Sequence, residues 1–305
     1  MVQPIIVLAG AAGDLGTRIA TALTARGATI RALVRPDASA SDADRVAATG
    51  AILTPADAAD VASVAAACAG AACVVCALNG LRDVILDRQG VLLDAAVRAG
   101  VPRFIPSDYS ADFTRTRPGG NRNLDLRRAF MERADRAPIK VTSILNGAFL
   151  DMLGAEMPII QPRIRRVLYW GSADQPLDFT AKDDVAAYAA AAACDADTPR
   201  ILRVAGDTVS ARGIARAMSE ATGERYRPLR AGSIRSLGVL IRLTRLVAPQ
   251  PRATFPPWQG MQYMRDMFSG RGTLEPLDND RYPGLRWTSV PAHLAAGPAA
   301  AARTR

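Results

Sequence analysis

The chain has 305 residues, 49% of them hydrophobic, and a formal net charge of +9 that comes almost entirely from arginine. This size allows two domains with a sizeable core, and the sequence shows no signal-peptide pattern, membrane-length apolar run, zinc-ligand spacing or helix-turn-helix motif. We therefore expect a globular cytoplasmic protein, monomeric or homodimeric, that has no metal site and binds neither a membrane nor nucleic acid.

Short apolar runs alternate with helical patterns through the first half of the chain. The apolar runs have the length of strands, and the predicted strands are residues 5–9, 29–34, 52–53, 73–78, 103–106 and 141–145. The predicted helices, which carry apolar residues at helical spacing, are residues 15–26, 61–68, 84–99 and 124–133. Strands that are apolar throughout and alternate with helices indicate an α/β fold, namely a doubly wound parallel sheet of the Rossmann type. Such a sheet binds its ligand at the carboxyl ends of the strands.

The alternation is looser in the second half, which indicates a Rossmann-type domain at 1–155 and a smaller C-terminal α/β domain at 156–305. The elements predicted there are a strand at 165–171, a helix at 183–194, a strand at 201–204 and helices at 210–222 and 233–247. We expect about 180–208 to return to the main sheet and 297–305 to form a mobile tail. The pattern of 233–247 favours a surface helix packed on the smaller domain, and a helix on a membrane surface is the alternative.

Cys73 and Cys76 form a C-x-x-C pair, a spacing also found at redox and metal sites. The pair lies within the apolar run 72–77, which predicts a buried strand. Positions three apart on a strand face opposite sides of the sheet. We therefore interpret both thiols as parts of the core.

Gly10, Gly13 and Gly16 occupy the turn between the first predicted strand and the first predicted helix. In a dinucleotide-binding turn, the first glycine permits the tight bend and the second lets the backbone approach the pyrophosphate. The third lets helix and strand pack closely, and the free N–H groups of the helix N-terminus attract the phosphates. The other residues of this turn that we expect to contact the cofactor are Ala12, Asp14 and Leu15.

Arg35 ends the second predicted strand, at the distance from the glycine turn where the adenosine ribose is read. An arginine there pairs with the 2′-phosphate of NADP(H), whereas an acidic residue would accept hydrogen bonds from the ribose of NAD. Asp37 is the rival residue, and we favour NADP(H). Further cofactor contacts are expected where the fourth and fifth strands end, at Leu78, Asn79 and Ser107.

The glycine turn and the strand end 33–35 occur together with three later segments, 103–109, 145–149 and 178–186. Together these motifs resemble the NmrA-like and isoflavone-reductase-like branch of the atypical short-chain dehydrogenases. The resemblance implies a Rossmann-type fold, bound NADPH, and Asn146 and Phe149 beside the nicotinamide. It also implies one of two activities: reduction of aromatic substrates, or dinucleotide binding that regulates a protein partner.

The catalytic lysine of the reductases in this family corresponds to Asn123, and the chain also lacks a Tyr-x-x-x-Lys pair, since Phe113 stands where that lysine would follow Tyr109. The polar groups expected near the nicotinamide are therefore Tyr109, Asp108 and Asn123. Tyr109 is the candidate proton donor, provided that its surroundings lower its pKa, with a purely structural tyrosine as the alternative. Asn123 could orient a substrate or a water molecule but has no acidic proton to give.

The sequence predicts an NADPH-dependent reductase of a small organic substrate, such as an aromatic compound or a secondary metabolite. A redox sensor that binds NADP(H) without turnover is the first alternative, and an isomerase or lyase on the same fold is the second. The apolar segment 256–264 is either core of the smaller domain or one wall of the substrate pocket.

Overall fold

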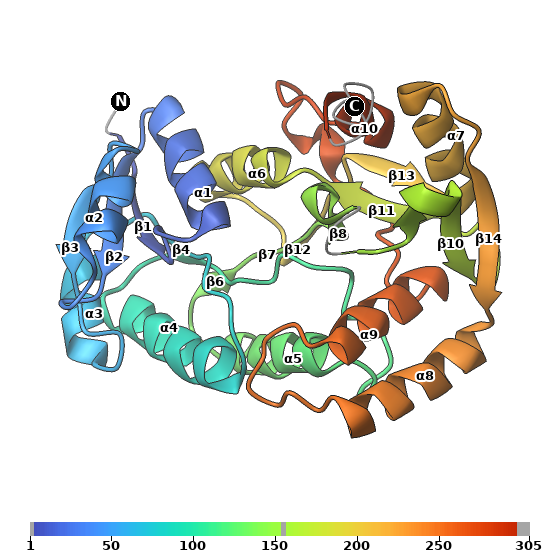
Figure 1. Cartoon of the computed structure of the whole chain (residues 1–305). Helices are drawn as coiled ribbons and strands as arrows, with labels where there is room; N and C mark the ends of the chain where they lie inside the picture. The colour runs from blue at the N-terminus through green and yellow to red at the C-terminus, as the bar shows by residue number, and fades with distance from the viewer. Residues whose placement is uncertain (1–2, 154–156, 298–305) are drawn as a thin grey trace.

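The computed structural model describes residues 3–153 and 157–297 and contains one large parallel sheet. Its strands are β1 (Ile5–Ala9), β2 (Thr29–Val34), β3 (Ile52–Pro55), β4 (Cys73–Cys76), β5 (Arg103–Ile105) and β6 (Lys140–Val141). They lie in the order β3-β2-β1-β4-β5-β6, and all neighbouring pairs are parallel (Figure 1). The order reverses between β1 and β4, which is the switch point at which doubly wound sheets bind ligands. The predicted fold class is confirmed.

A further pair of parallel strands follows β6. After a single intervening residue the chain enters β7 (Ser143–Leu145), which pairs in parallel with β12 (Ile201–Arg203). The strand expected at 201–204 therefore lies next to the last strand of the first half.

Helices cover both faces of the main sheet (Figure 1). On one face α1 (Asp14–Ala25) packs beside α6 (Lys182–Cys194). The opposite face is covered by α3 (Val61–Cys68), α4 (Gln89–Arg98) and α5 (Arg122–Ala134). A π-helical segment, Asp83–Arg88, leads directly into α4, and α2 (Ala40–Ala47) follows β2.

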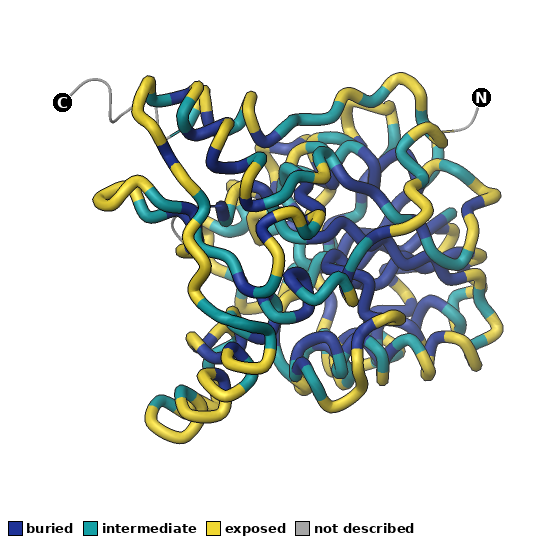
Figure 2. The backbone as a smooth tube through the Cα atoms, turned by 90° about the vertical axis from the view of Figure 1, so that its right-hand side faces the viewer, coloured by how far each residue is buried: buried dark blue, intermediate teal, exposed yellow. Residues whose placement is uncertain are grey.

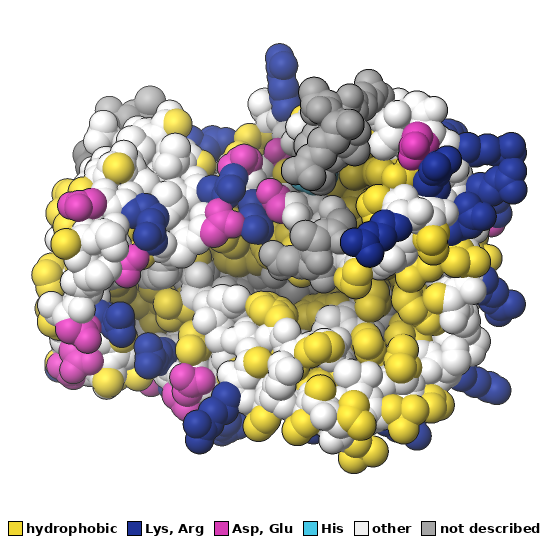
Figure 3. All heavy atoms as spheres, in the orientation of Figure 1, with side chains coloured by type: hydrophobic (Ala, Val, Ile, Leu, Met, Phe, Trp, Pro, Cys, Tyr) yellow, Lys and Arg dark blue, Asp and Glu magenta, His cyan; other side chains and the backbone are white. Residues whose placement is uncertain are grey.

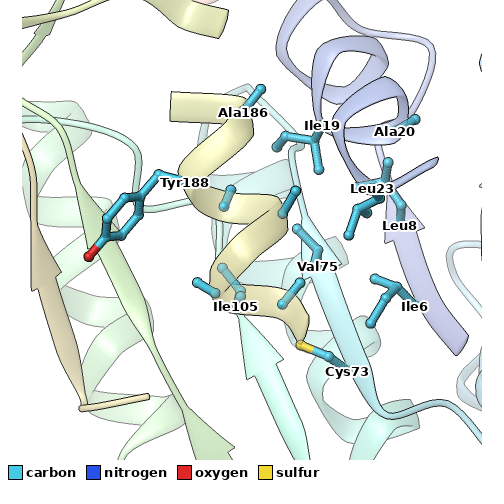
Figure 4. Packing of buried hydrophobic residues seen from close by; sticks show 14 of the residues in the cluster. Ile6, Leu8, Ile19, Ala20, Leu23, Cys73, Val75, Ile105, Ala186 and Tyr188 are labelled. Atoms are coloured by element: carbon cyan, nitrogen blue, oxygen red, sulfur yellow. The ribbon is translucent and has the colours of Figure 1, made fainter. Parts of the chain in front are cut away.

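The two faces of the sheet have separate apolar cores. Figure 4 shows one of them, in which Ile19 and Leu23 of α1 lie near Val75 of β4, beside α6. Cys73 belongs to this core, whereas Cys76 belongs to the core on the other face, and both are free thiols. Burial raises the pKa of both thiols. The prediction that the C-x-x-C pair is core material on opposite sides is confirmed.

Besides α6 and β12, the later part of the chain forms two small sheets and four further helices in the described residues. The strands are β8 (Ala148–Phe149), β11 (Leu177–Thr180) and β13 (Asp207–Val209) in one sheet, and β9 (Ile160–Gln161), β10 (Arg166–Trp170) and β14 (Arg227–Gly232) in the other. The helices are α7 (Ala211–Thr222), α8 (Ile234–Val247), α9 (Pro257–Phe268) and α10 (Val290–Ala296). Short 3-10 turns occur at Leu150–Met152, Pro162–Ile164 and Asn279–Arg281. A core of its own joins these elements.

Local capping explains several helix ends. Asn121 accepts a hydrogen bond from the backbone N–H of Leu124, so α5 begins earlier than its apolar pattern predicts. Ser210 caps α7 in the same way, and Gly223 ends that helix in the left-handed region at φ 75°. The predicted mobile tail lies outside the described residues, except for Gly297.

Within residues 3–153 and 157–297, no helix is both long and apolar enough to cross a membrane. In the same described part, no group of three or more His, Cys, Asp or Glu side chains is arranged to hold a metal ion.

Candidate functional site

The turn between β1 and α1 requires glycine at two of its three positions. Gly10 has φ +82°, and a Cβ added there would lie 2.8 Å from the carbonyl carbon of Ala77. A Cβ at Gly16 would lie only 2.0 Å from the carbonyl oxygen of Gly10. Both glycines are therefore needed to let the turn fold against β4 and the helix start approach it.

Gly13 differs from the other two glycines because the space beside it is open except toward the carbonyl oxygen of Gly10, which an added Cβ would crowd. An added Cβ would meet only the carbonyl oxygen of Gly10, at 3.3 Å, and its φ of −75° is open to other residues. Gly13 is the N-cap of α1, and no described side chain caps the helix there. The open space therefore faces uncapped backbone N–H groups at the positive end of the helix dipole, which is a fitting cradle for phosphates.

Four charged side chains surround the first turn of α1. Asp14 Oδ2 lies 2.7 Å from Lys182 Nζ, Asp14 Oδ1 lies 2.7 Å from Arg18 Nε, and Arg18 Nη1 lies 2.6 Å from Asp183 Oδ1. The hydrogen bonds from Lys182 and Arg18 hold the pKa of Asp14 below its ordinary value. The two cations balance the two carboxylates, Asp14 and Asp183, which would otherwise repel an anion at this helix end.

Lys182 is a residue of this region that sequence reasoning missed. It lies at the start of α6, 168 residues from Asp14 along the chain, and no local motif links the two. Only the packing of α6 against α1 brings its ammonium group to the glycine turn.

Arg35 lies just beyond the end of β2, at the same edge of the sheet as the glycine turn. Its side chain is 61% exposed, and its only ion pair among the described residues is a loose one, 3.7 Å between Nε and Asp37 Oδ1. The guanidinium is therefore free to bind a phosphate, because breaking an exposed ion pair of this kind costs almost no free energy.

Ser107 connects the ends of two neighbouring strands. Its hydroxyl donates to the carbonyl oxygen of Leu78 at 2.6 Å, and its backbone N–H donates to Gln89 Oε1 at 2.8 Å. Leu78 is half-buried and Asn79 is exposed. These contacts fix the carboxyl ends of β4 and β5 side by side.

Asp108 is fully buried and bonded on one oxygen only. Its Oδ2 accepts a hydrogen bond from Ser143 Oγ at 2.5 Å, while Oδ1 has no partner within the described residues. Ser143 Oγ in turn accepts a hydrogen bond from Arg200 at 2.8 Å. Burial raises the pKa of Asp108, opposed by the Ser143 hydrogen bond and by the positive charge of Arg127. Asp108 thus ties the end of β5 to β7.

Tyr109 lies in the core between the sheet and α6, in the cluster that also contains Ile105, Ile144 and Val185. Its hydroxyl is buried and has no hydrogen-bond partner in the part of the chain that the structure describes. Burial raises the pKa of this hydroxyl well above its ordinary value, which makes the unassisted group a weaker acid than an exposed tyrosine and departs from the condition of a lowered pKa. A buried hydroxyl without a partner lowers the stability of the fold by about 1–3 kcal/mol. A catalytic role is one reason why a protein would keep such a group.

Asn146 follows β7 and is also fully buried. Its backbone N–H donates to the carbonyl oxygen of Ser110 at 2.9 Å, but neither atom of its side-chain amide has a partner in the described structure. The next residue, Gly147, has φ +68°, and a Cβ there would lie 2.4 Å from the carbonyl oxygen of Asp178. Phe149, in β8, is half-buried against the core of the main sheet.

The structure therefore brings most of the predicted site residues to one edge of the main sheet. They follow β1, β2, β4, β5 and β7, whose carboxyl ends lie at that edge. In Figure 3 the surface is hollowed between the half with α1 and α6 and the half with α4 and α5, and hydrophobic side chains line part of the hollow.

Asn123 is held by contacts of a different kind. It is buried near the start of α5, its amide nitrogen donates to the carbonyl oxygen of Thr254 at 3.0 Å, and its Oδ1 accepts from Arg122 Nε at 3.1 Å. Arg122 also donates to the carbonyl oxygens of Ala253 and Thr254 and lies over the ring of Trp258. Both side chains thus anchor the segment between α8 and α9.

Replacing Asn123 by alanine should lower the free energy of unfolding by about 1–3 kcal/mol, because two hydrogen bonds, to the half-buried Thr254 carbonyl and the half-buried Arg122 guanidinium, are lost at about 0.5–1.5 kcal/mol each. Urea denaturation measures this change. Asn79→Ala, at an exposed position, is the control and should leave stability unchanged. Equal stability of Asn123→Ala and the wild type would contradict the anchoring role.

Comparison with known proteins identifies the family of this chain. Residues 3–234 match the model of the NmrA-like family. The chain belongs to the NmrA-like family. That match ends at the first residue of α8, so the rest of α8 and all of α9 lie beyond it. Among curated proteins, none matches the sequence.

Solved structures share the fold of this NmrA-like chain at low sequence identity. AtPrR2 with NADP+ and (+)pinoresinol is 20% identical at a TM-score of 0.78, over 97% of this chain and 99% of that one. An isoflavone reductase is 18% identical at a TM-score of 0.80, over 96% and 99% of the two chains. An NADPH-dependent quinone oxidoreductase from Escherichia coli is 18% identical at a TM-score of 0.73, over 95% and 98%. The family resemblance seen in the sequence motifs is thus confirmed.

Proposed function

We propose that this protein is an NADPH-dependent reductase of a small organic substrate. The observation that carries the proposal is the turn between β1 and α1, where Gly13 leaves an open cradle over uncapped backbone N–H groups. Proteins of the same fold include reductases whose structures contain NADP+ or NADPH, which supports this choice of cofactor.

The residues that would hold the cofactor belong to the ends of adjacent strands. The turn around Gly13 would bind the pyrophosphate, and Arg35 would pair with the 2′-phosphate. Asn146 and Phe149 would flank the nicotinamide ring. When bound, NADPH supplies the hydride, so the protein must orient the substrate and handle the proton.

Tyr109 is the residue we propose for the proton. Its hydroxyl is protonated and unpartnered in the described structure, so it can donate a hydrogen bond to an oxygen on which negative charge develops. Burial raises the pKa of Tyr109 and so works against full proton transfer, which requires that a bound substrate or cofactor lower this pKa. Asp108 and Asn146 would act as positioning residues, since Asp108 fixes the end of β5 and Asn146 the end of β7.

Arg35→Ala should weaken NADPH binding by about ten- to a hundred-fold, since a charge-assisted pair contributes about 1.5–3 kcal/mol. Binding of NADH should hardly change, because it lacks the 2′-phosphate. Calorimetric titration of both cofactors into wild type and variant tests this. If NADPH and NADH bind the wild type equally well, the assignment of Arg35 is wrong.

A dinucleotide sensor without turnover is the second candidate. It is favoured by Asn123, which stands where the reductases of the family have a lysine and which anchors the segment between α8 and α9. A sensor would bind NADPH with the same cradle but would not oxidise it with any substrate.

A further inference from the structure

One helix of the smaller domain exposes a row of large aliphatic side chains. Helix α8 packs on the domain through Leu237 and Ile241, which are buried. Its opposite side carries Leu243 at 55% exposure, Leu246 at 78% and Val247 at 84%. Further along the same side lie Val239 and Leu240, also exposed. In Figure 2 this helix, at the bottom of the view, is exposed along much of its length.

Arginines occupy the strip of α8 between its buried and its exposed apolar sides. At 100° per residue, Arg235, Arg242 and Arg245 fall on one flank of the helix, next to the aliphatic row. Arg245 also lies 5.1 Å from the ring centre of Trp258, which holds its side chain against the domain. The helix therefore has three faces: one buried, one cationic and one apolar and uncovered.

The charge around α8 has one sign only. Between Glu224 and Arg265 the sequence contains no acidic residue and the seven arginines 225, 227, 230, 235, 242, 245 and 252. In Figure 3, basic side chains (dark blue) lie along the edge where β14 lies, and hydrophobic side chains (yellow) lie over the region of α8.

A second arginine-rich region, a surface hollow, lies at the end of β14 opposite to α8. It is lined by Arg163, Arg165, Arg166, Arg225 and Arg227, at the start of the parallel strands β10 and β14. One acid, Glu224, pairs with Arg165 at 3.3 Å. The five arginines carry more positive charge than this one carboxylate can neutralise, so the hollow suits phosphate groups.

We propose that this face, formed by α8 and β14, docks the protein on an anionic lipid bilayer, which replaces the expectation from composition that the protein binds no membrane. Aliphatic side chains on one side of a helix, flanked by arginines and lacking acids, suit a helix that lies in the bilayer interface. The apolar row would enter the acyl boundary while the arginines meet lipid phosphates. A second copy of the chain would bring the same arginines face to face, which like-charge repulsion disfavours. Of this face, only α8 lies beyond the family match, which ends at residue 234.

Flotation with lipid vesicles tests the proposal. Full-length protein should bind vesicles of equimolar phosphatidylcholine and phosphatidylserine at least about ten-fold more strongly than pure phosphatidylcholine vesicles, and added salt should weaken the binding. Leu246→Glu should reduce binding to the anionic vesicles by about ten-fold or more. Arg235→Gln with Arg242→Gln should reduce it by about five-fold for each arginine removed.

A matched control is Ile52→Glu, which changes an aliphatic side chain of 56% exposure in β3, at the far edge of the main sheet, and should leave vesicle binding unchanged. All variants should keep the thermal stability of the wild type, which separates loss of docking from loss of fold. Failure of the wild type to bind anionic vesicles, or equal binding by Leu246→Glu, would overturn the proposal. A dimer in light scattering that Leu246→Glu dissociates would instead assign the face to self-association and likewise overturn it.

Discussion

Replacing Gly13 by valine should abolish NADPH binding while the protein stays folded. The added side chain would fill the open space at the N-terminus of α1, where the pyrophosphate must approach the backbone. Valine can adopt the extended conformation of Gly13, and its Cβ would meet only one backbone oxygen, at 3.3 Å. Calorimetry should therefore detect no NADPH binding, and the thermal unfolding midpoint should fall by only a few degrees.

The contrast with Gly16 makes this test specific. Gly16→Ala would place a Cβ 2.0 Å from the carbonyl oxygen of Gly10, so that variant should lose stability as well as binding. If Gly13→Val binds NADPH as the wild type does, the turn between β1 and α1 is not the pyrophosphate site.

Tyr109→Phe should lower kcat by about 10²–10⁴-fold, the usual contribution of a general acid, with little change in NADPH affinity. Phenylalanine keeps the ring in its core position beside Ile105 and Val185 and removes only a hydroxyl that has no partner in the described structure. Stability should therefore stay the same or increase, because an unsatisfied buried group is removed. Steady-state kinetics together with thermal unfolding measure both effects.

Tyr188→Phe is the matched control for this substitution. Its hydroxyl donates to the carbonyl oxygen of Asp278 at 2.9 Å, within the same core but with a structural role. That variant should lose stability and keep kcat. Unchanged turnover in Tyr109→Phe would remove Tyr109 as the proton donor and leave a water molecule or a group of the substrate in that role.

The main sheet could be predicted because its local patterns are strong. Residues 61–68 are helical as expected. The short, continuous apolar runs that become β1, β2 and β4 are typical of parallel strands buried on both faces. Helix α2 was missed because it is short, mostly polar, and has Val46 as its one buried residue, so few apolar residues mark its inner face. The strands β8, β9 and β13 are two or three residues long, which is too short for any repeating pattern.

Only those residues of the candidate site that directly follow a strand could be predicted from the sequence. The glycine spacing identifies the turn, and the switch point then places Ser107 and Asn146 at the same edge. Contacts between distant segments carry no such signal. Lys182 reaches Asp14, and Asn123 reaches Thr254, only through the packing of helices that are far apart in the sequence.

The most direct test of the proposed function is oxidation of bound NADPH in a single turnover, followed by its absorbance, with a panel of carbonyl compounds, enones and imines. We expect at least one compound to accelerate the oxidation in the wild type, and none to do so in Gly13→Val. If NADPH binds in the micromolar range but no compound accelerates its oxidation, the protein is a dinucleotide sensor and the assignment as a reductase is contradicted.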